Sequence, residues 1–147
     1  MKKLLALVFA LVMLFSVTAI AEPITLQIGF ENSMSEPIGQ ALTKWQELVA
    51  EKGDGSIVIE LFPDSQLGNK TDLIDQMLLG EPVMTLADGA FFADYGVPDM
   101  GIVFGPFLFE NWDQCWTLIE SEWWADQCEQ LEALGIKMVA ANWAYGA

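Results

Sequence analysis

Acidic and small polar residues directly follow three apolar stretches of this sequence, and they are the first candidates for chemistry. They form the pairs Glu31 and Asn32, Asp64 and Ser65, and Asp88 and Gly89. Ionised carboxylates accept hydrogen bonds from hydroxyl groups and pair with ammonium groups, so a site built from Glu31 and Asp88 suits a polar small molecule. The alternative is ordinary loop chemistry, because Asp, Asn, Ser and Gly occur in turns of every kind.

The residue types that the sequence lacks narrow the chemistry further. The 147 residues include no His, 6 Lys or Arg and 21 Asp or Glu, for a formal charge of −15. Without His, neither a Ser-His-Asp triad nor a His-ligated zinc site can form, and so acidic a chain cannot neutralise nucleic-acid phosphates. Gly-rich phosphate loops and calcium-loop spacings are also missing. We therefore expect neither an enzyme nor a nucleic-acid-binding protein, and no cofactor or metal.

The amino terminus has the pattern of an export signal. Lys2 and Lys3 precede an apolar stretch at residues 4–20, and Ala19 and Ala21 supply the small residues that a signal peptidase reads. We predict a cleaved signal peptide at residues 1–21 and, in a cell with two membranes, a periplasmic protein. An uncleaved membrane anchor is the alternative, since about 17 apolar residues approach a spanning length.

Hydrophobic periodicity alternates between strand-like and helix-like along the first half of the remaining chain. Strands are predicted at residues 25–30, 56–62 and 83–87. The helix between the first two strands ends at Gly53, and the next is capped by Asn69 or Thr71 and ends near Gly80. This alternation predicts an α/β fold with a largely parallel or mixed sheet. Because ligands bind beyond the carboxyl ends of such strands, the polar pairs would lie together there.

The second half of the chain is predicted to be less regular. An extended segment is expected within residues 96–109, a helical region from Asn111 or Asp113 to Leu134, and a last strand at residues 136–143. Four tryptophans lie at helical spacing in the helical region, where core packing is favoured over a partner surface. They are Trp112, Trp116, Trp123 and Trp124.

Two cysteines, Cys115 and Cys128, lie in neighbouring helical patterns. An exported protein can keep a disulfide, and a helix-turn-helix could bring the two sulfur atoms together. The sequence leaves a Cys115–Cys128 disulfide and a pair of buried thiols both open.

The run ELFPDSQLG at residues 60–68 resembles the hallmark motif of the solute-binding proteins of TRAP transporters, the tripartite ATP-independent periplasmic family. Other blocks are similar to this family in the same order along the chain. They lie at residues 41–52, 73–80, 104–109 and 135–146, with Gly105 in place of the usual apolar residue. The resemblance therefore covers essentially the whole chain after the signal.

The resemblance implies the first lobe of a two-lobed periplasmic-binding-protein-like fold, with most of the second lobe missing. Residues 22–135 would form the first lobe with its crossing segment and helical region, and residues 136–147 would lead towards the hinge. The family's signature arginine, which pairs with a ligand carboxylate, would stand one residue beyond Ala147. We therefore expect an amino-terminal fragment that binds its ligand more weakly than a two-lobed protein.

The resemblance also implies which residues contact the ligand: Glu31, Asn69, Asp88, Trp143 and Tyr145. The acceptor oxygens of Glu31 and Asp88 favour a hydroxylated acid such as a sugar acid, or a zwitterion, over a plain dicarboxylate. The alternative is that one or both acids only cap helices.

These expectations combine into a receptor outside the cytoplasm that captures a small organic acid and delivers it to the membrane permease subunits of a transporter. Two alternatives belong to other classes. One is an exported glycoside-processing enzyme with Glu31 and Asp88 as acid and base, which requires opposed pKa values. The other is an exported sensor or adhesion module.

Overall fold

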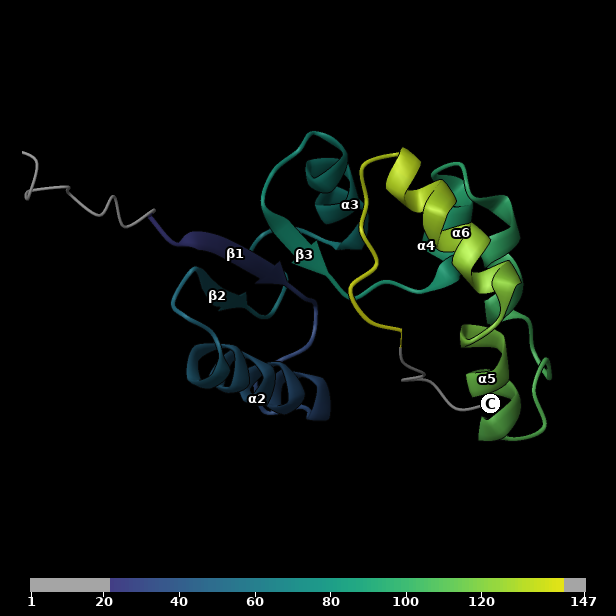
Figure 1. The fold of residues 1–147 in the computed structure, drawn as a ribbon, viewed down its shortest axis with the longest axis horizontal. Helices are drawn as coiled ribbons and strands as arrows, with labels where there is room; N and C mark the ends of the chain where they lie inside the picture. Colours follow the sequence, from purple (N-terminus) through teal and green to yellow (C-terminus); the bar gives the residue numbers. More distant parts are fainter. Residues whose placement is uncertain (1–21, 142–147) are drawn as a thin grey trace, which may run out of the picture.

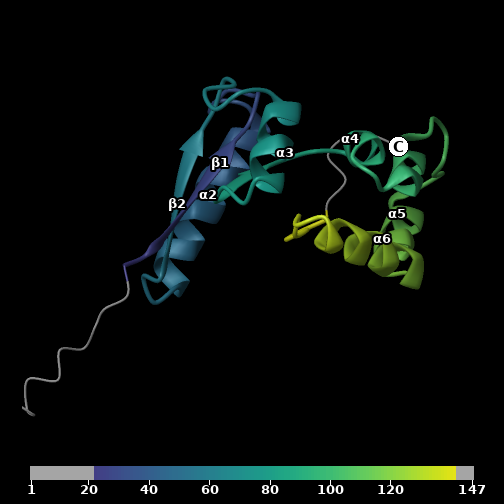
Figure 2. The ribbon, with the colours of Figure 1, turned by 90° about the horizontal axis from the view of Figure 1, so that it is seen from above.

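A small parallel sheet and a group of helices divide the chain between them (Figure 1). The structure, a computed structural model, describes residues 22–141. The first part consists of β1 (Ile24–Gly29), α2 (Pro37–Lys52), β2 (Ile57–Phe62), α3 (Lys70–Leu78) and β3 (Val83–Thr85). The second part consists of α4 (Gly89–Asp94), the 3-10 helix η1 (Pro98–Phe104), α5 (Trp112–Ile119) and α6 (Glu122–Ala133). Seen from above, α4, α5 and α6 group on the side away from β2 (Figure 2).

The sheet has three parallel strands in the order β2-β1-β3, which confirms the predicted parallel α/β fold. Side chains alternate across the central strand. Ile28 and Phe30 are buried in a cluster with Leu42 of α2. Gly29, between them, faces α3, because a β-carbon there would lie 2.8 Å from Leu73 Cδ1. Helices α2 and α3 therefore cover opposite faces of the sheet (Figure 1).

Local sequence explains where α2 and α3 begin and end. Pro37 opens α2 after the N-cap residue Glu36, and Gly53 ends it by donating its N–H to Val49 O. Asn69 caps α3 in a capping box: its side chain accepts from Asp72 N, and the Asp72 carboxylate accepts from Asn69 N. These bounds confirm the predicted helix ends, and they assign the cap to Asn69.

The helices of the second part pack onto α3 through one apolar cluster. Its buried members are Ile74, Phe92, Val97, Met100, Leu131 and Ile136. Side chains cap the helices here as well: Asn111 accepts from Gln114 N at the start of α5, and Ser121 accepts from Trp124 N at the start of α6. The predicted helical region from Asn111 is therefore confirmed, divided in two at Ser121.

Two elements of the second part differ from the prediction. Residues 98–104, expected to be extended, form η1, which packs tightly on the unpredicted helix α4: a β-carbon at Gly89 would collide with the Met100 carbonyl oxygen. Residues 136–141 form no strand. Their apolar pattern suits a strand, but a strand also needs a neighbouring backbone to pair with, and in the part of the chain that the structure describes none pairs with them. Residues 142 and 143 lie outside the described range.

The cysteines are free thiols, so the Cys115–Cys128 disulfide is not formed in this structure. Cys115 is buried in α5, and its Sγ lies 3.7 Å from the Asn111 carbonyl oxygen of its own helix. Cys128 is half-buried in α6, and burial raises the pKa of its thiol. The Cys115 thiol therefore donates a hydrogen bond to the start of its own helix.

The tryptophans of the helical region differ in burial, so core packing holds for some of them and not for others. Trp124 packs against the core cluster, as core packing predicts, whereas Trp112 and Trp116 are 47% and 44% exposed.

Candidate functional site

A cavity of about 550 Å³ lies where the ends of β1 and β3 meet the helices of the second part. Much of its lining is apolar and includes Phe30, Phe92, Val103 and Trp124. Four charged side chains join this lining: Glu31, Glu36, Lys70 and Asp88. An apolar cavity with a few convergent polar groups is the usual form of a small-molecule site.

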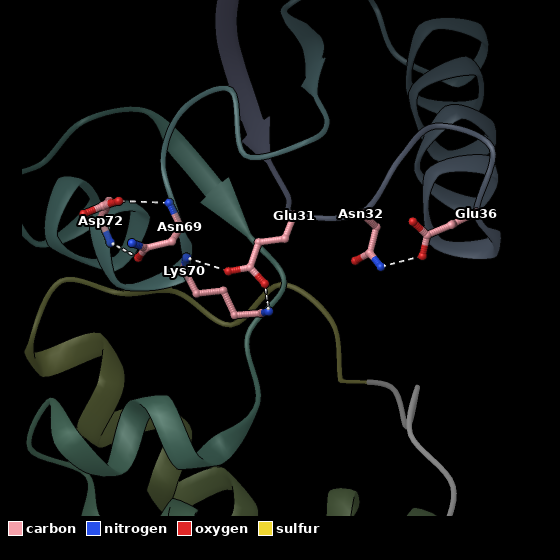
Figure 3. Close-up of polar contacts among 6 residues, drawn as sticks. All are labelled: Glu31, Asn32, Glu36, Asn69, Lys70 and Asp72. Atoms are coloured by element: carbon pink, nitrogen blue, oxygen red, sulfur yellow. Dashed lines mark hydrogen bonds and ion pairs between the residues drawn. The ribbon is translucent and has the colours of Figure 1, made fainter.

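Glu31 and Lys70 form an ion pair at this cavity (Figure 3). Lys70 Nζ lies 2.6 Å from Glu31 Oε2, and the backbone N–H of Lys70 donates to Glu31 Oε1 at 3.3 Å. The hydrogen bond from the Lys70 ammonium holds the pKa of the Glu31 carboxyl below its usual value. Glu31 is therefore ionised at neutral pH and cannot donate a proton there.

Glu36 is held in place by two donors on the loop after β1, of which Figure 3 shows the one from Asn32. Its Oε1 accepts from the backbone N–H of Ser33 at 2.9 Å, and its Oε2 accepts from Asn32 Nδ2 at 2.8 Å. The hydrogen bond from Ser33, with that from Asn32, lowers the pKa of the Glu36 carboxyl. Glu36 thus organises the first loop of the cavity and adds a second negative charge.

Asp88 both lines the cavity and caps α4, since its Oδ1 accepts from the backbone N–H of Ala90 at 3.0 Å. A carboxylate has two oxygens, so one remains to accept a hydrogen bond from a ligand. The sequence presented a ligand site and a helix cap as alternatives for Asp88, and in the structure Asp88 both lines the cavity and caps α4.

The remaining candidate site residues either lie outside the cavity lining or lie outside the described residues. Asn69 is exposed and its side chain is engaged in the cap of α3, and it is not among the residues that line the cavity. Asp64 and Ser65 also lie outside the lining and form a turn with positive φ values of 54° and 57°. Trp143 and Tyr145 lie outside the described residues.

Lys70 and Glu36 are charged cavity residues that the sequence did not indicate as site candidates, and Lys70 is the positive one. Its partner Glu31 is 39 positions away, so no local pattern connects them. One signal was available: Lys70 follows the LGN stretch of residues 67–69, and the first residue of a helix that follows a parallel strand lies at the carboxyl edge of the sheet.

Other site types find little support in residues 22–141. The structure shows no group of three or more His, Cys, Asp or Glu side chains arranged to hold a metal ion in that range. No helix within the same residues has the length and apolar character needed to cross a membrane.

A parallel α/β sheet whose strand ends open on such a cavity defines a class, the small-molecule-binding proteins. Residues 28–147 match the model of bacterial extracellular solute-binding protein family 7, named DctP, and the chain belongs to this family. The resemblance indicated by residues 60–68 is therefore confirmed.

Characterised relatives are similar to the chain along most of its length. The C4-dicarboxylate-binding periplasmic protein DctP of Rhodobacter capsulatus is 28% identical over 131 residues, which are 89% of this chain and 39% of that protein. The 2,3-diketo-L-gulonate-binding periplasmic protein YiaO of Escherichia coli K12 is 30% identical over 132 residues, 90% of this chain and 39% of that protein. The chain thus spans about two-fifths of the length of these relatives.

Solved structures agree with this assignment. A TRAP periplasmic solute-binding protein from Ochrobacterium anthropi with bound L-fuconate is 34% identical, with a TM-score of 0.79, and the match covers 84% of this chain and 41% of that one. A TRAP periplasmic solute-binding protein from Actinobacillus succinogenes 130z with bound L-galactonate is 32% identical, with a TM-score of 0.69 over 75% of this chain and 36% of that one.

Proposed function

We propose that this chain supplies one side of the ligand site of a periplasmic solute receptor, which captures a hydroxylated organic acid for the permease subunits of a TRAP-type transporter. The observation that carries the proposal is the cavity at the carboxyl ends of β1 and β3, with acceptor oxygens of Glu31 and Asp88 in its lining. Export through the signal at residues 1–21 would bring the site to the periplasm.

The chemistry of the lining supports a sugar acid as the ligand. Carboxylates accept hydrogen bonds from hydroxyl groups, which a polyhydroxylated acid offers in number and a plain dicarboxylate does not. The apolar walls, among them Phe30 and Phe92, suit the carbon skeleton of such a ligand. Two similar solved proteins hold L-fuconate and L-galactonate, which are acids of this kind.

The electrostatics of the site support binding over glycoside hydrolysis. A glycosidase needs one carboxylic acid whose pKa is raised, so that it can protonate the leaving group at neutral pH. The pKa of Glu31 is shifted the opposite way by Lys70, and Asp88 accepts the Ala90 N–H as a helix cap. Glu31 is therefore suited to accept hydrogen bonds and poorly suited to act as the acid of a glycosidase.

Ligand-observed saturation-transfer NMR, which detects weak binding, tests the proposal on the purified protein. The panel is L-fuconate, galactonate, succinate and an uncharged sugar. We expect saturation transfer to the two sugar acids, weaker transfer to succinate, and no turnover of sugar conjugates in a parallel assay. Absence of transfer to every sugar acid, or release of product from a conjugate, would contradict the receptor function.

A matched pair of variants shows whether the ligand occupies this cavity. Ala140 lines the cavity and is exposed, so Ala140→Trp should fill it and remove the sugar-acid signal. Ala50 is exposed on α2, away from the lining, so Ala50→Trp should leave the signal unchanged. Equal signals from both variants would place the ligand elsewhere.

A further inference from the structure

Two Asp–Gly pairs occur in the sequence, Asp54–Gly55 and Asp88–Gly89. In such a pair the backbone nitrogen of the glycine can attack the carboxyl carbon of the aspartate, because glycine has no side chain to shield its nitrogen or to restrict its backbone angles. The attack also needs a backbone that can rotate until a five-membered ring closes. The surroundings of each pair therefore decide whether it reacts.

The first pair lies where the fold leaves the backbone free. Asp54 and Gly55 belong to the loop between α2 and β2, and both residues are exposed. Gly55 has a positive φ of 83°, and a β-carbon built on it would have no other atom within 4 Å. Loops are less constrained than the elements that they connect. Packing within residues 22–141 therefore leaves the Gly55 peptide free to rotate.

The Asp54 side chain is already folded towards the bond that it would attack. Its Oδ1 accepts a hydrogen bond from the backbone N–H of Ser56 at 3.0 Å, two residues further along the chain. This hydrogen bond closes over the Gly55 peptide and keeps the carboxyl group beside the Gly55 nitrogen. The reacting carbon and nitrogen are therefore neighbours in the folded protein.

The second pair has the same local hydrogen bond but different surroundings. Asp88 Oδ1 accepts from the backbone N–H of Ala90 at 3.0 Å. Gly89, however, is buried and is the first residue of α4, and a β-carbon on it would collide with the Met100 carbonyl oxygen. Ring closure at Asp88 would have to move a helix start out of a close-packed contact. The structure thus separates two pairs that the sequence makes equivalent.

We propose that Asp54 is a site of spontaneous conversion to isoaspartate. The Gly55 nitrogen attacks Asp54 Cγ, and the proton of that nitrogen leaves with a carboxyl oxygen as one molecule of water, which closes a five-membered imide. One molecule of water then opens the imide. Opening at the bond from nitrogen to Cγ restores aspartate, whereas opening at the main-chain carbonyl leaves isoaspartate, with the chain running through Cβ and Cγ. Atoms balance, and the step needs no oxidant or cofactor.

The modification would act on the beginning of the sheet. Ser56, directly after the pair, accepts at its carbonyl oxygen from the backbone N–H of Ile24 at 2.8 Å, next to the register pair Ile24 and Ile57. An additional main-chain carbon before Ser56 shifts this carbonyl and loosens the first hydrogen bond between β1 and β2. The cavity lies at the carboxyl ends of the strands, so this modification is separate from the proposed ligand site.

Ageing the purified protein in water enriched in heavy oxygen tests the proposal. Hydrogen bonds from the Ser56 hydroxyl and backbone N–H lower the pKa of the Asp54 carboxyl, and only the protonated carboxyl loses water readily, so the buffer is mildly acidic. Imide opening leaves one heavy oxygen atom in the peptide, which mass spectrometry locates. In the folded protein Asp54 should be labelled at least about tenfold faster than Asp88, a ratio that a small difference in barrier provides. In urea both should be labelled at similar rates.

A matched pair of variants assigns the label and its consequence. Asp54→Glu keeps the charge but would need a larger ring, so the label and the isomeric peptide should disappear. Asp113→Glu, exposed on α5, should leave both unchanged. Hydrogen exchange at the Ile24 amide should be faster in the aged wild-type protein than in the aged Asp54→Glu variant.

Three outcomes would overturn the proposal. One is equal labelling of Asp54 and Asp88 in the folded protein. Another is an unlabelled Asp54 in the folded protein when the sample in urea is labelled. The third is a label at residue 54 that persists in Asp54→Glu. Galactonate plays no part in these measurements, so their result is independent of the proposed function.

Discussion

At the scale of single residues, the Glu31–Lys70 pair links the stability of the fold to pH. The pKa of Glu31 is lowered by the Lys70 hydrogen bond from an ordinary value of 4.5. The stabilisation is therefore fully present above that value and is lost as pH falls through the lowered pKa. Because Glu31 is 40% exposed, we expect Glu31→Gln to lower the free energy of unfolding by less than about 1 kcal/mol at neutral pH. Urea unfolding at several pH values should show this difference shrinking in acid.

A double-mutant cycle checks that the effect belongs to the pair. In a Lys70→Met background the ammonium is missing, so Glu31→Gln should change the free energy of unfolding much less than it does in the wild-type protein. A difference that persists in the Lys70→Met background, or one that grows in acid, would show that Glu31 stabilises the fold through another partner.

At the scale of elements, the start of α3 depends on one side chain that the sequence leaves ambiguous. The Asn69 side chain accepts from Asp72 N at 3.1 Å, and Asn69 N donates to Asp72 Oδ2 at 2.9 Å, so Asn69→Ala should cost about 1 kcal/mol of unfolding free energy. Asn69→Ser keeps an acceptor and should retain most of this stability. Thr71→Ala should have little effect, because the cap is Asn69. Thermal unfolding followed by circular dichroism measures all three, and a larger loss for Thr71→Ala would assign the cap to Thr71.

At the scale of the whole molecule, one apolar cluster connects α3, beside the sheet, to α4, η1 and α6. Leu131 is fully buried in this cluster, so Leu131→Ala should cost about 2–5 kcal/mol, from lost burial and the cavity left behind. Because the cluster joins both parts, tryptophan fluorescence and far-ultraviolet circular dichroism should report one shared transition in both proteins. Leu79, which is 82% exposed, is the control: Leu79→Ala should change stability by less than about 0.5 kcal/mol. Two separate transitions in the wild-type protein would mean that the parts unfold independently.

The sequence by itself determined the elements that local patterns encode. Hydrophobic periodicity predicted β1, β2 and β3, Gly53 marked a helix end, and Asn69 or Thr71 marked a helix start. The order of strands and helices was enough for a parallel sheet, because right-handed crossovers leave few other arrangements. The motif at residues 60–68 indicated the family because a motif is a local sequence pattern, which does not depend on contacts with distant residues.

Only the tertiary structure decided the features that depend on distant partners. Lys70 entered the site because α3 begins next to Glu31, which follows β1 and lies 39 positions away from Lys70 in the chain. Cys115 and Cys128 are free thiols in the fold, and residues 136–141 formed no strand because no neighbouring backbone pairs with them in the described range. Periodicity and propensity report what a segment can become, whereas a salt bridge, a disulfide or a strand pairing also requires that the fold bring a second segment into contact.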